Sequence, residues 1–397
     1  MREGWEYKKL GEVCNVINGL WTGKKEPFIN VAVIRNTNFS KDCQLNLDNV
    51  AYIDVEAKQF ASRKLLLGDI IIEKSGGSEK QPVGRPILFN ISEGDYSFSN
   101  FTSTLRIKED AKVESSFLHK CLYAFYLKGE TLKLQSKTTG LHNLNMKGYL
   151  RQNIPLPPKS TQLAIVSELD KINELIRLKK EQLKDFDNLA QSIFYEMFGD
   201  PVENEMGWEV KKLGEIGEVK TGNTPSRSNV NFYNEKFIEW IKTDNIRNEQ
   251  MNPTTAAEYL SREGAECGRI VSKGSILVAC IAGSLSSIGK CCITTKNVAF
   301  NQQINAITPY EEFCNSIYLY ELIRNSSKYI QQNATTGMKH ILSKSIFEKM
   351  KFPLPPLTLQ HLFAHRIEQI EHQKSEVQNA ITDLETLLAS RMQYWFE

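Results

Sequence analysis

The sequence predicts an α+β fold in which a mixed α/β domain followed by a long helix occurs twice. Three observations support this prediction: a repeated opening line, a repeated Pro-rich junction and a heptad pattern after each junction. GWEYKKLGEV at 4–13 and GWEVKKLGEI at 207–216 agree at eight of ten positions. NIPLPPKSTQ at 153–162 matches KFPLPPLTLQ at 351–360. A chain of 397 residues is long enough for two such units.

The composition is that of a globular protein with sizeable cores. Hydrophobic residues make up 41% and charged residues 24% of the chain. The longest apolar run, ILVACIA at 276–282, is too short to cross a bilayer. The opening MREGWEYKKL lacks the apolar core of a signal peptide, so we expect a cytoplasmic protein. The eight cysteines form no C-x-x-C pair, which predicts small buried residues and neither disulfides nor zinc ligands.

Charge alternates along four segments, although the whole chain carries only +2. The first mixed domain, 1–153, has 22 Lys/Arg against 17 Asp/Glu, and the second, 204–351, has 18 against 15. The helical segments 154–203 and 352–397 have 6 against 9 and 3 against 6. Basic domains suit a polyanionic partner, whereas acidic helices do not. The excesses are modest, so charge alone leaves nucleic acid and other partners equally open.

The repeat continues through both mixed domains, since short strands, glycine turns and polar clusters recur in the same order. A helix is expected over 115–128 in the first copy and over 315–330 in the second. The matched segments are 67–77 and 273–283, 99–107 and 300–308, and 138–140 and 335–337.

A long amphipathic helix is predicted after each Pro-rich junction, and Ser160 or Thr161 is placed to cap the first one. Apolar residues then recur with 4-3 spacing, as in helices that pair along their length. Only Lys179 interrupts the first pattern, and Lys374 interrupts the second. The positions are 165, 169, 172, 176, 179, 183, 186, 190, 193 and 197, and then 363, 367, 370, 374, 377, 381, 384, 388, 391 and 395.

Because both patterns belong to one chain, we expect the two helices to pair antiparallel as a coiled coil with pseudo-two-fold symmetry. A helix over 160–198 would be about 58 Å long, which makes it a spacer between the two domains. The alternative is two separate helices, each packed on its own domain.

No catalytic motif is evident in the sequence. GSLSSIGKC at 283–291 and GLWTGKK at 19–25 resemble phosphate-binding loops, but their spacing is wrong. Cys291 also stands where such a loop needs a hydroxyl for magnesium. We therefore predict no catalytic residue in this chain.

His361 and His365 have a spacing that could bind zinc, with Glu368 and His372 beyond them. In the 4-3 register, however, both histidines fall on the outer face of the last helix. We interpret them as surface residues and predict no metal ligand.

The candidate contact surface consists of loops that occupy matching places in the two copies but carry different residues. Lysine holds phosphates, asparagine can pair with adenine and arginine reads guanine. Each loop alone is equally well explained as an ordinary turn. The candidates in the first domain are Asn18, Trp21, Thr22, Lys24, Lys25, Arg35, Asn36, Asn38, Lys74, Ser75, Lys80, Thr139, His142, Asn143 and Lys147. Those in the second are Asn223, Thr224, Ser226, Arg227, Lys242, Thr243, Asn245, Arg247, Ser284, Gln302, Gln303, Thr336, Lys339 and His340.

Taken together, the two GWE-x-KKLGE lines, the paired PLPP-x-x-x-Q junctions and the two heptad helices resemble the specificity subunit of type I restriction–modification systems. The resemblance covers essentially the whole chain and lies in the ordered duplication. It implies that each mixed region is a target-recognition domain for one half of a bipartite DNA target. It also implies that the helices are conserved spacers that set the gap between the halves.

The resemblance further implies that the chain is not catalytic and works with partners. These are double-stranded DNA, two methyltransferase (M) subunits that use S-adenosylmethionine to methylate adenine, and restriction (R) subunits that use ATP. These cofactors, and magnesium, are then expected on the partner subunits and none on this chain. Two alternatives remain open: a coiled-coil scaffold with protein-binding domains, and a free-standing DNA-modifying enzyme with an unrecognised active site.

Overall fold

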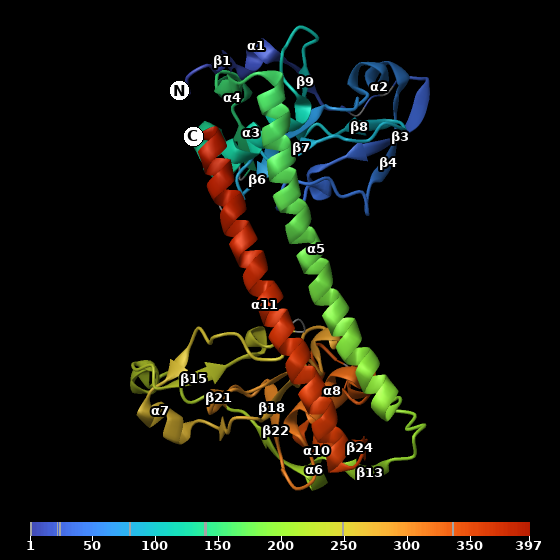
Figure 1. Ribbon diagram of the computed structural model, residues 1–397, viewed down its shortest axis with the longest axis vertical. Helices are drawn as coiled ribbons and strands as arrows, with labels where there is room; N and C mark the ends of the chain where they lie inside the picture. Colours follow the sequence, from blue (N-terminus) through green and yellow to red (C-terminus); the bar gives the residue numbers. More distant parts are fainter. Residues whose placement is uncertain are drawn as a thin grey trace. The chain divides into compact units, whose positions relative to one another are not determined.

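The structure is a computed structural model that describes residues 2–21, 23, 25–78, 81–138, 141–247, 250–335 and 337–397 (Figure 1). The chain divides into two compact units. Unit 1 comprises Met1–Leu178 and Ile381–Glu397, and unit 2 comprises Lys179–Ala380. Each unit contains one mixed α/β region and part of both long helices.

Unit 1 is built around a four-stranded antiparallel sheet in which a run of isoleucines forms a fully buried central strand. Two three-stranded sheets and one strand pair lie around it. In sheet order the strands are β2 (Cys14–Asn18), β9 (Thr102–Ile107), β5 (Ile70–Glu73) and β7 (Pro86–Leu88); β4 (Ala51–Glu56), β3 (Phe28–Ile34) and β8 (Tyr96–Phe98); β10 (Gln135–Thr138), β11 (Leu141–Leu144) and β6 (Ser75–Gly77); and β1 (Glu6–Lys9) with β12 (Asn153–Leu156).

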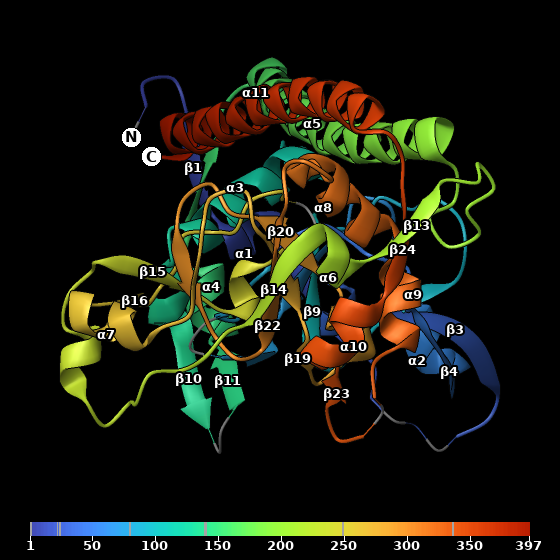
Figure 2. The ribbon, with the colours of Figure 1, turned by 90° about the horizontal axis from the view of Figure 1, so that it is seen from below.

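Unit 2 repeats this topology strand for strand in its main sheet, parts of which are labelled in Figure 2. This sheet again has a buried aliphatic strand at its centre. In sheet order the strands are β14 (Gly217–Thr221), β22 (Ile304–Pro309), β18 (Ile276–Ala279) and β20 (Cys291–Ile293); β16 (Tyr259–Leu260), β15 (Ile238–Ile241), β21 (Val298–Phe300) and β17 (Ile270–Val271); β19 (Ile281–Ala282) with β23 (His340–Ile341); and β13 (Glu209–Lys212) with β24 (Lys351–Leu354). The repeated sequence thus folds into repeated architecture.

Short helices connect the strands. The helix expected over 115–128 is confirmed, but the one expected over 315–330 is divided at Ser326. The Ser326 N–H donates to the carbonyls of both Leu322 and Ile323, as a chain does when it tightens at a helix end. The α-helices are α1 (Leu10–Val13), α2 (Ala57–Arg63), α3 (Ser115–Leu127), α4 (Met146–Leu150), α6 (Leu213–Ile216), α7 (Arg262–Cys267), α8 (Ser316–Asn325), α9 (Ser327–Gln332) and α10 (Lys344–Lys349). The 3-10 turns are η1 (Asn36–Asn38), η2 (Glu130–Leu134), η3 (Val230–Tyr233), η4 (Thr243–Asn245) and η5 (Leu285–Ser287).

The glutamine of each PLPP-x-x-x-Q junction is completely buried and fastens a long helix to its mixed region. The Gln162 amide donates to the carbonyls of Lys112 and Pro157, both at 2.9 Å, and its Oε1 accepts from the Glu114 N–H at 2.8 Å. Glu114 is the N-cap residue of α3, so this side chain joins two helix starts.

Gln360 does the same in unit 2. Its amide donates to the carbonyls of Phe313 and Pro355, and its Oε1 accepts from the N–H of Asn315, the N-cap of α8. The junction motif therefore encodes one contact that both units contain.

The two long helices, α5 (Lys159–Phe198) and α11 (Leu357–Phe396), are each 40 residues long. The first begins at Lys159, so Ser160 and Thr161 lie inside its first turn and are not its cap. None of the twenty predicted 4-3 positions is exposed. His361 and His365 are exposed, as the register predicted.

Within each unit the helices run antiparallel. In unit 2, Asp187 of α5 bonds Lys374 of α11, while Met197 lies beside Arg366. Higher numbers on one helix thus meet lower numbers on the other. In unit 1, Glu168 accepts from Arg391 and from the Trp395 indole N–H, the latter at 3.0 Å.

The charged interruptions of the heptad pattern have different roles. Lys374 is buried and bonds Asp187 at 3.1 Å and Glu371 at 2.8 Å, and Arg324 of α8 reaches the same Asp187 oxygen at 3.0 Å. Burial opposes the Lys374 charge, but the Glu371 and Asp187 carboxylates outweigh it and raise the pKa of the ammonium. Lys179 instead bonds Gln182 on its own helix. Lys374 therefore links α11 to α5, and the shared Asp187 links this helix pair to α8.

The eight cysteines are all free, and seven of them are buried, as the sequence predicted. Cys267, on α7, is exposed.

Among the described residues, no helix is both long and apolar enough to span a membrane.

Replacing Gln162 by leucine should lower the free energy of unfolding by about 2–4 kcal/mol, because a buried N–H and two carbonyls lose their partner. Urea denaturation of the full chain measures this. Leucine in place of Gln373, on the exposed face of α11, is the matched control and should change stability by less than about 0.5 kcal/mol. Equal effects of the two substitutions would contradict the buried fastening.

Replacing Lys374 by methionine should cost about 1–2 kcal/mol of unfolding free energy. This is less than a fully buried pair would lose, because Arg324 still neutralises Asp187. The double variant Asp187→Asn with Lys374→Met should lose less than the sum of the two single variants, and a thermodynamic cycle from urea denaturation measures the coupling. Strict additivity would show that the ion pair is not coupled.

Candidate nucleic-acid interface

The candidate loops of unit 1 converge at one edge of its sheets. The loop after β2, the turn after β3 and the turn before β9 meet there, because β2 pairs with β9 and β3 runs parallel to β8. They surround a hollow of about 410 Å³. Three predicted residues line it, Trp21, Arg35 and Asn36, together with Leu20, Gly23, Val33, Thr37, Ile53, Asp54, Val55, Ser99, Asn100 and Phe101.

The walls of this hollow offer both aromatic and polar contacts. Trp21 is 61% and Phe101 44% exposed, a large exposure for aromatic side chains. The Asn36 amide donates to the Ser75 carbonyl at 2.6 Å, and its Oδ1 is buried without a partner among the described residues. Arg35 is exposed beside it. Such a surface suits stacking and hydrogen bonding to bases.

A second cluster of unit 1 lies on the β10–β11–β6 sheet. Ser75 donates to Asn143 at 2.6 Å, which links β6 to β11. Burial lowers the pKa of the neighbouring Lys74 ammonium. His142 on β11 is buried, and its Nδ1 has no partner among the described residues. This cluster joins the hollow through the Asn36–Ser75 hydrogen bond.

Three other described candidates of unit 1, Asn18, Lys25 and Lys147, lie at the surface. Asn18 ends β2 and accepts from Ser103 at 3.1 Å. Lys25 is exposed, and its backbone N–H donates to Glu56 at 2.8 Å. Lys147 is exposed on α4. These residues are accessible but do not line the hollow.

The corresponding place in unit 2 carries different side chains. Thr224 and Gln302 are exposed and hydrogen-bond to each other. Arg227 and Lys242 both form ion pairs with Glu258. Burial opposes ionisation of Glu258, but the hydrogen bonds from Lys242 and Arg227 prevail and hold the pKa of the carboxyl below its usual range. The site therefore keeps three fixed charges.

Other candidates of unit 2 lie on loops nearby. Ser226 contacts Ser228 at 2.8 Å, and Ser284 contacts Ser287 at 3.0 Å. His340 on β23 is half-buried, with an Nδ1 that lacks a partner among the described residues. The exposed cations are Arg247 and Lys339, and Thr243 is half-buried in η4.

Besides His142, two predicted contact residues belong to the interior. Asn38 is buried, and its amide donates to the carbonyls of Asn46 and Asn49 while its Oδ1 accepts from the Arg35 N–H. Asn245, its counterpart in unit 2, is also buried. It bonds Thr254, Thr255 and the Lys242 N–H in the same way. The structure thus places both side chains inside the unit, where their polar atoms hold the loop and are not presented at the surface.

Two further candidates have hydrogen bonds within the unit, Asn223 to the end of α7 and Gln303 to its own loop. Asn223 donates to the Cys267 carbonyl at 2.8 Å and accepts from the Arg269 N–H at 2.7 Å. Gln303 accepts from Asn301 at 3.1 Å. Predicted residues that lie outside the described part of the chain are Thr22, Lys24, Lys80, Thr139 and Thr336.

Sequence reasoning missed several residues of these surfaces. The predicted residues were mainly basic, amide and hydroxyl side chains with one aromatic residue, Trp21, whereas Phe101, Asp54 and Glu258 are aromatic or acidic. The turn before β9 and its counterpart before β22 were matched in the repeat, and that signal could have drawn attention to Phe101. No comparable signal existed for Glu258.

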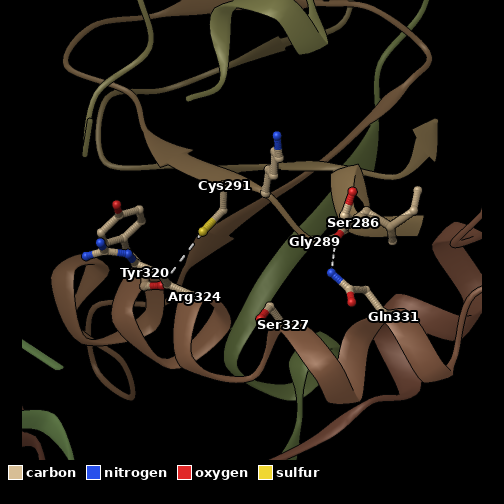
Figure 3. Close-up of a pocket in the computed structure, with 9 residues that line it drawn as sticks. Ser286, Gly289, Cys291, Tyr320, Arg324, Ser327 and Gln331 are labelled. Carbon is tan, nitrogen blue, oxygen red and sulfur yellow. Dashed lines mark hydrogen bonds between the residues drawn. The ribbon is translucent and has the colours of Figure 1, made fainter. Parts of the chain in front are cut away.

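The glycine-rich segment at 283–291 does not form a phosphate-binding loop. It runs from β19 through η5 into the strand β20, whereas a phosphate-binding loop leads into the N-terminus of a helix. It borders a pocket of about 270 Å³, in which Gln331 donates to the Ile288 carbonyl at 3.2 Å (Figure 3). Cys291 is buried there and donates to the Tyr320 carbonyl. The segment thus forms one wall of this pocket, and α8 and α9 form the opposite wall. Within the described ranges, no group of three or more metal-ligating side chains occurs.

The chain is similar to known proteins over most of its length. A family model described as "Type I restriction modification DNA specificity domain" matches residues 2–185 and 205–385. The specificity subunit of the Haemophilus influenzae type I restriction enzyme HindI is 31% identical over 193 residues, which cover 47% of this chain and 41% of that one. The putative MjaX specificity subunit of Methanocaldococcus jannaschii is 20% identical, over 93% of this chain and 87% of that one.

Solved structures share the fold. A chain from a structure described as the basis of complex assembly and conformational transition of the type I R-M system has a TM-score of 0.64. It is 18% identical, and the match covers 100% of this chain and 98% of that one. The type I restriction–modification S subunit from M. genitalium has a TM-score of 0.56 at 13% identity, over 99% of this chain and 96% of that one.

Replacing Asn245 by alanine should lower the free energy of unfolding by about 1–3 kcal/mol, because the Lys242 N–H and the Thr254 and Thr255 carbonyls lose their partner. Alanine in place of the exposed Gln302 should change it by less than about 0.5 kcal/mol. Thermal and urea denaturation of both variants check the distinction. A larger loss for Gln302 than for Asn245 would reverse the assignment.

Proposed function

Since the chain belongs to the type I restriction–modification DNA specificity family, we propose that it selects the DNA target of a type I restriction–modification complex. Each mixed region then reads one half of a bipartite target. The observation that carries this proposal is the reuse of the main-sheet topology with different side chains at the same edge. Unit 1 presents Trp21, Arg35 and Phe101 there, whereas unit 2 presents Thr224 and Lys242.

The two edges suit different base sequences. Unit 1 offers an aromatic hollow, while unit 2 offers hydroxyl, amide and cationic groups. Different donors and acceptors discriminate different base edges in the major groove. The two half-sites are therefore expected to differ in sequence, and the target to be asymmetric.

The long helices are proposed to set the gap between the half-sites. α5 and α11 each contribute residues to both units, and none of their 4-3 positions is exposed. A helix has a fixed rise of about 1.5 Å per residue, so its length converts directly into a distance. The ion pairs of Lys374 with Asp187 and of Arg391 with Glu168 join the two helices and would keep them in register.

Catalysis is proposed to reside in partner subunits. Two methyltransferase subunits would bind S-adenosylmethionine and methylate adenine, and restriction subunits would use ATP and magnesium. This chain would hold none of these cofactors and would contribute only DNA contacts and a docking frame. The lack of an evident catalytic motif in the sequence supports this assignment of catalysis to the partner subunits.

Two other functions are less well supported. A coiled-coil scaffold that does not bind DNA would not explain why Trp21 and Phe101 are exposed around a hollow in a basic domain. A free-standing enzyme would modify DNA when purified alone with magnesium or a methyl donor, and we expect no such activity.

Base-resolution mapping of adenine methylation, in cells with and without this chain, tests the proposal. We expect one split motif, with an unspecified gap between its halves, to lose its methylation when the chain is absent. Restoring the intact chain should restore methylation at that motif. An unchanged methylation pattern, in cells shown to express the chain, would rule the proposal out.

A further inference from the structure

We propose that Arg227 is the side chain with which unit 2 reads a guanine in its half-site. Tyr233, Trp240 and Glu258 are then positioning residues that hold the guanidinium ready before DNA binds. The inference rests on the proposed function, because it assigns one base contact within that DNA interface.

The Arg227 guanidinium is packed against two aromatic rings. Its central carbon lies 4.5 Å from the ring centroid of Tyr233 and 4.8 Å from that of Trp240. The two rings meet edge to face, with centroids 6.1 Å apart. A guanidinium gains from such contacts through both charge and stacking.

The rings are themselves fixed in place. The Tyr233 hydroxyl donates to the Pro225 carbonyl at 2.6 Å, and the Trp240 indole N–H donates to the Asn223 carbonyl at 3.2 Å. Trp240 is only 2% exposed. Both acceptors belong to the loop that carries Arg227, so loop and rings hold one another.

Glu258 fixes the guanidinium from a further direction. One Arg227 nitrogen, Nη2, lies 2.6 Å from a Glu258 oxygen, and Lys242 pairs with the other oxygen. The Arg227 side chain is still 51% exposed. A guanidinium has five N–H donors, so an exposed edge remains available to a ligand.

This arrangement favours a base over a phosphate. A pre-positioned planar fork matches O6 and N7 of guanine in the major groove, and little side-chain entropy is lost on binding. The Glu258 carboxylate, in contrast, repels a phosphate that approaches Arg227 directly. Lys242 leaves the trio with a net positive charge, which keeps the surface attractive to DNA as a whole.

Unit 2 contains a matched control for this arginine. Arg262 on α7 also lies over an aromatic ring, 4.9 Å from the Phe237 centroid, and 3.8 Å from a Glu235 oxygen. Its side chain is 77% exposed, and a single ring supports it. Arg262 thus has the same side chain and the same kinds of contact, but it is not held between two rings and a carboxylate. If Arg227 contacts a base, lysine at position 227 should change the target sequence, whereas lysine at position 262 should not.

The test maps adenine methylation in cells that carry the chain as R227K, E258Q or R262K. R227K keeps the charge but loses the planar fork. We expect it to make one guanine position of one half-site degenerate and to lower methylation of the original motif at least about tenfold, with the other half-site unchanged. E258Q should relax the same position, because the guanidinium loses its anchor, and R262K should leave the motif intact.

A binding measurement gives a second readout. The purified full chain is titrated with a duplex that contains the mapped target, and with the same duplex carrying 7-deazaguanine at the sensitive position. Loss of N7 should weaken binding by the wild-type chain about tenfold and leave binding by R227K almost unchanged. Melting temperatures of R227K and R262K that match that of the wild-type chain would show that both variants are folded.

The outcomes separate the two proposals. If a split motif depends on the chain but R227K and R262K both leave it unchanged, the Arg227 inference is wrong and the proposed function stands. A uniform loss of methylation by R227K, with the motif unaltered, would assign Arg227 to a phosphate and overturn the inference. If no split motif depends on the chain, the proposed function fails, and the inference fails with it.

Discussion

Both units depend on one interaction, the burial of a glutamine side chain in the first turn of a long helix. Gln162 and Gln360 are themselves completely buried, and each satisfies two carbonyls and one N–H of the backbone. An unpaired buried group costs about 1–3 kcal/mol, so the arrangement tolerates little displacement. All these partners are backbone atoms, and the surrounding side chains can therefore differ between the two copies without changing how the helix starts.

The fold was predictable where it depends on local periodicity. Heptad spacing identified both seams, because residues on the same face of a helix recur every three or four positions. The repeated sequence segments revealed the two units. The break at Ser326 was not predictable, since the residues around it read as one continuous helix. The role of Lys374 was equally hidden, because one of its neighbours, Arg324, comes from a helix about fifty residues earlier in the chain.

The candidate surfaces were predictable as loops but not as individual contacts. Asn36 and Asn38 are two residues apart and look alike in sequence. One lines the hollow, and the other is buried beneath the turn that both belong to. A short turn of this kind points neighbouring side chains in different directions. The amino-acid sequence of a loop does not reveal which side chain points outward. Acidic and aromatic supports such as Glu258 and Tyr233 escape a search that looks only for groups able to bind a polyanion.

The distribution of the cysteines has a practical consequence for chemical labelling. Burial raises the thiol pKa of Cys14, Cys43, Cys121, Cys280, Cys291, Cys292 and Cys314, and only the thiolate is a good nucleophile. Cys267 is exposed, and its carbonyl accepts from Asn223 in the loop that carries Arg227. A maleimide dye added to the native, unmutated chain should therefore attach mainly at Cys267. The fold thus supplies a single fluorescent reporter beside the candidate contact surface of unit 2, with no cysteine to remove.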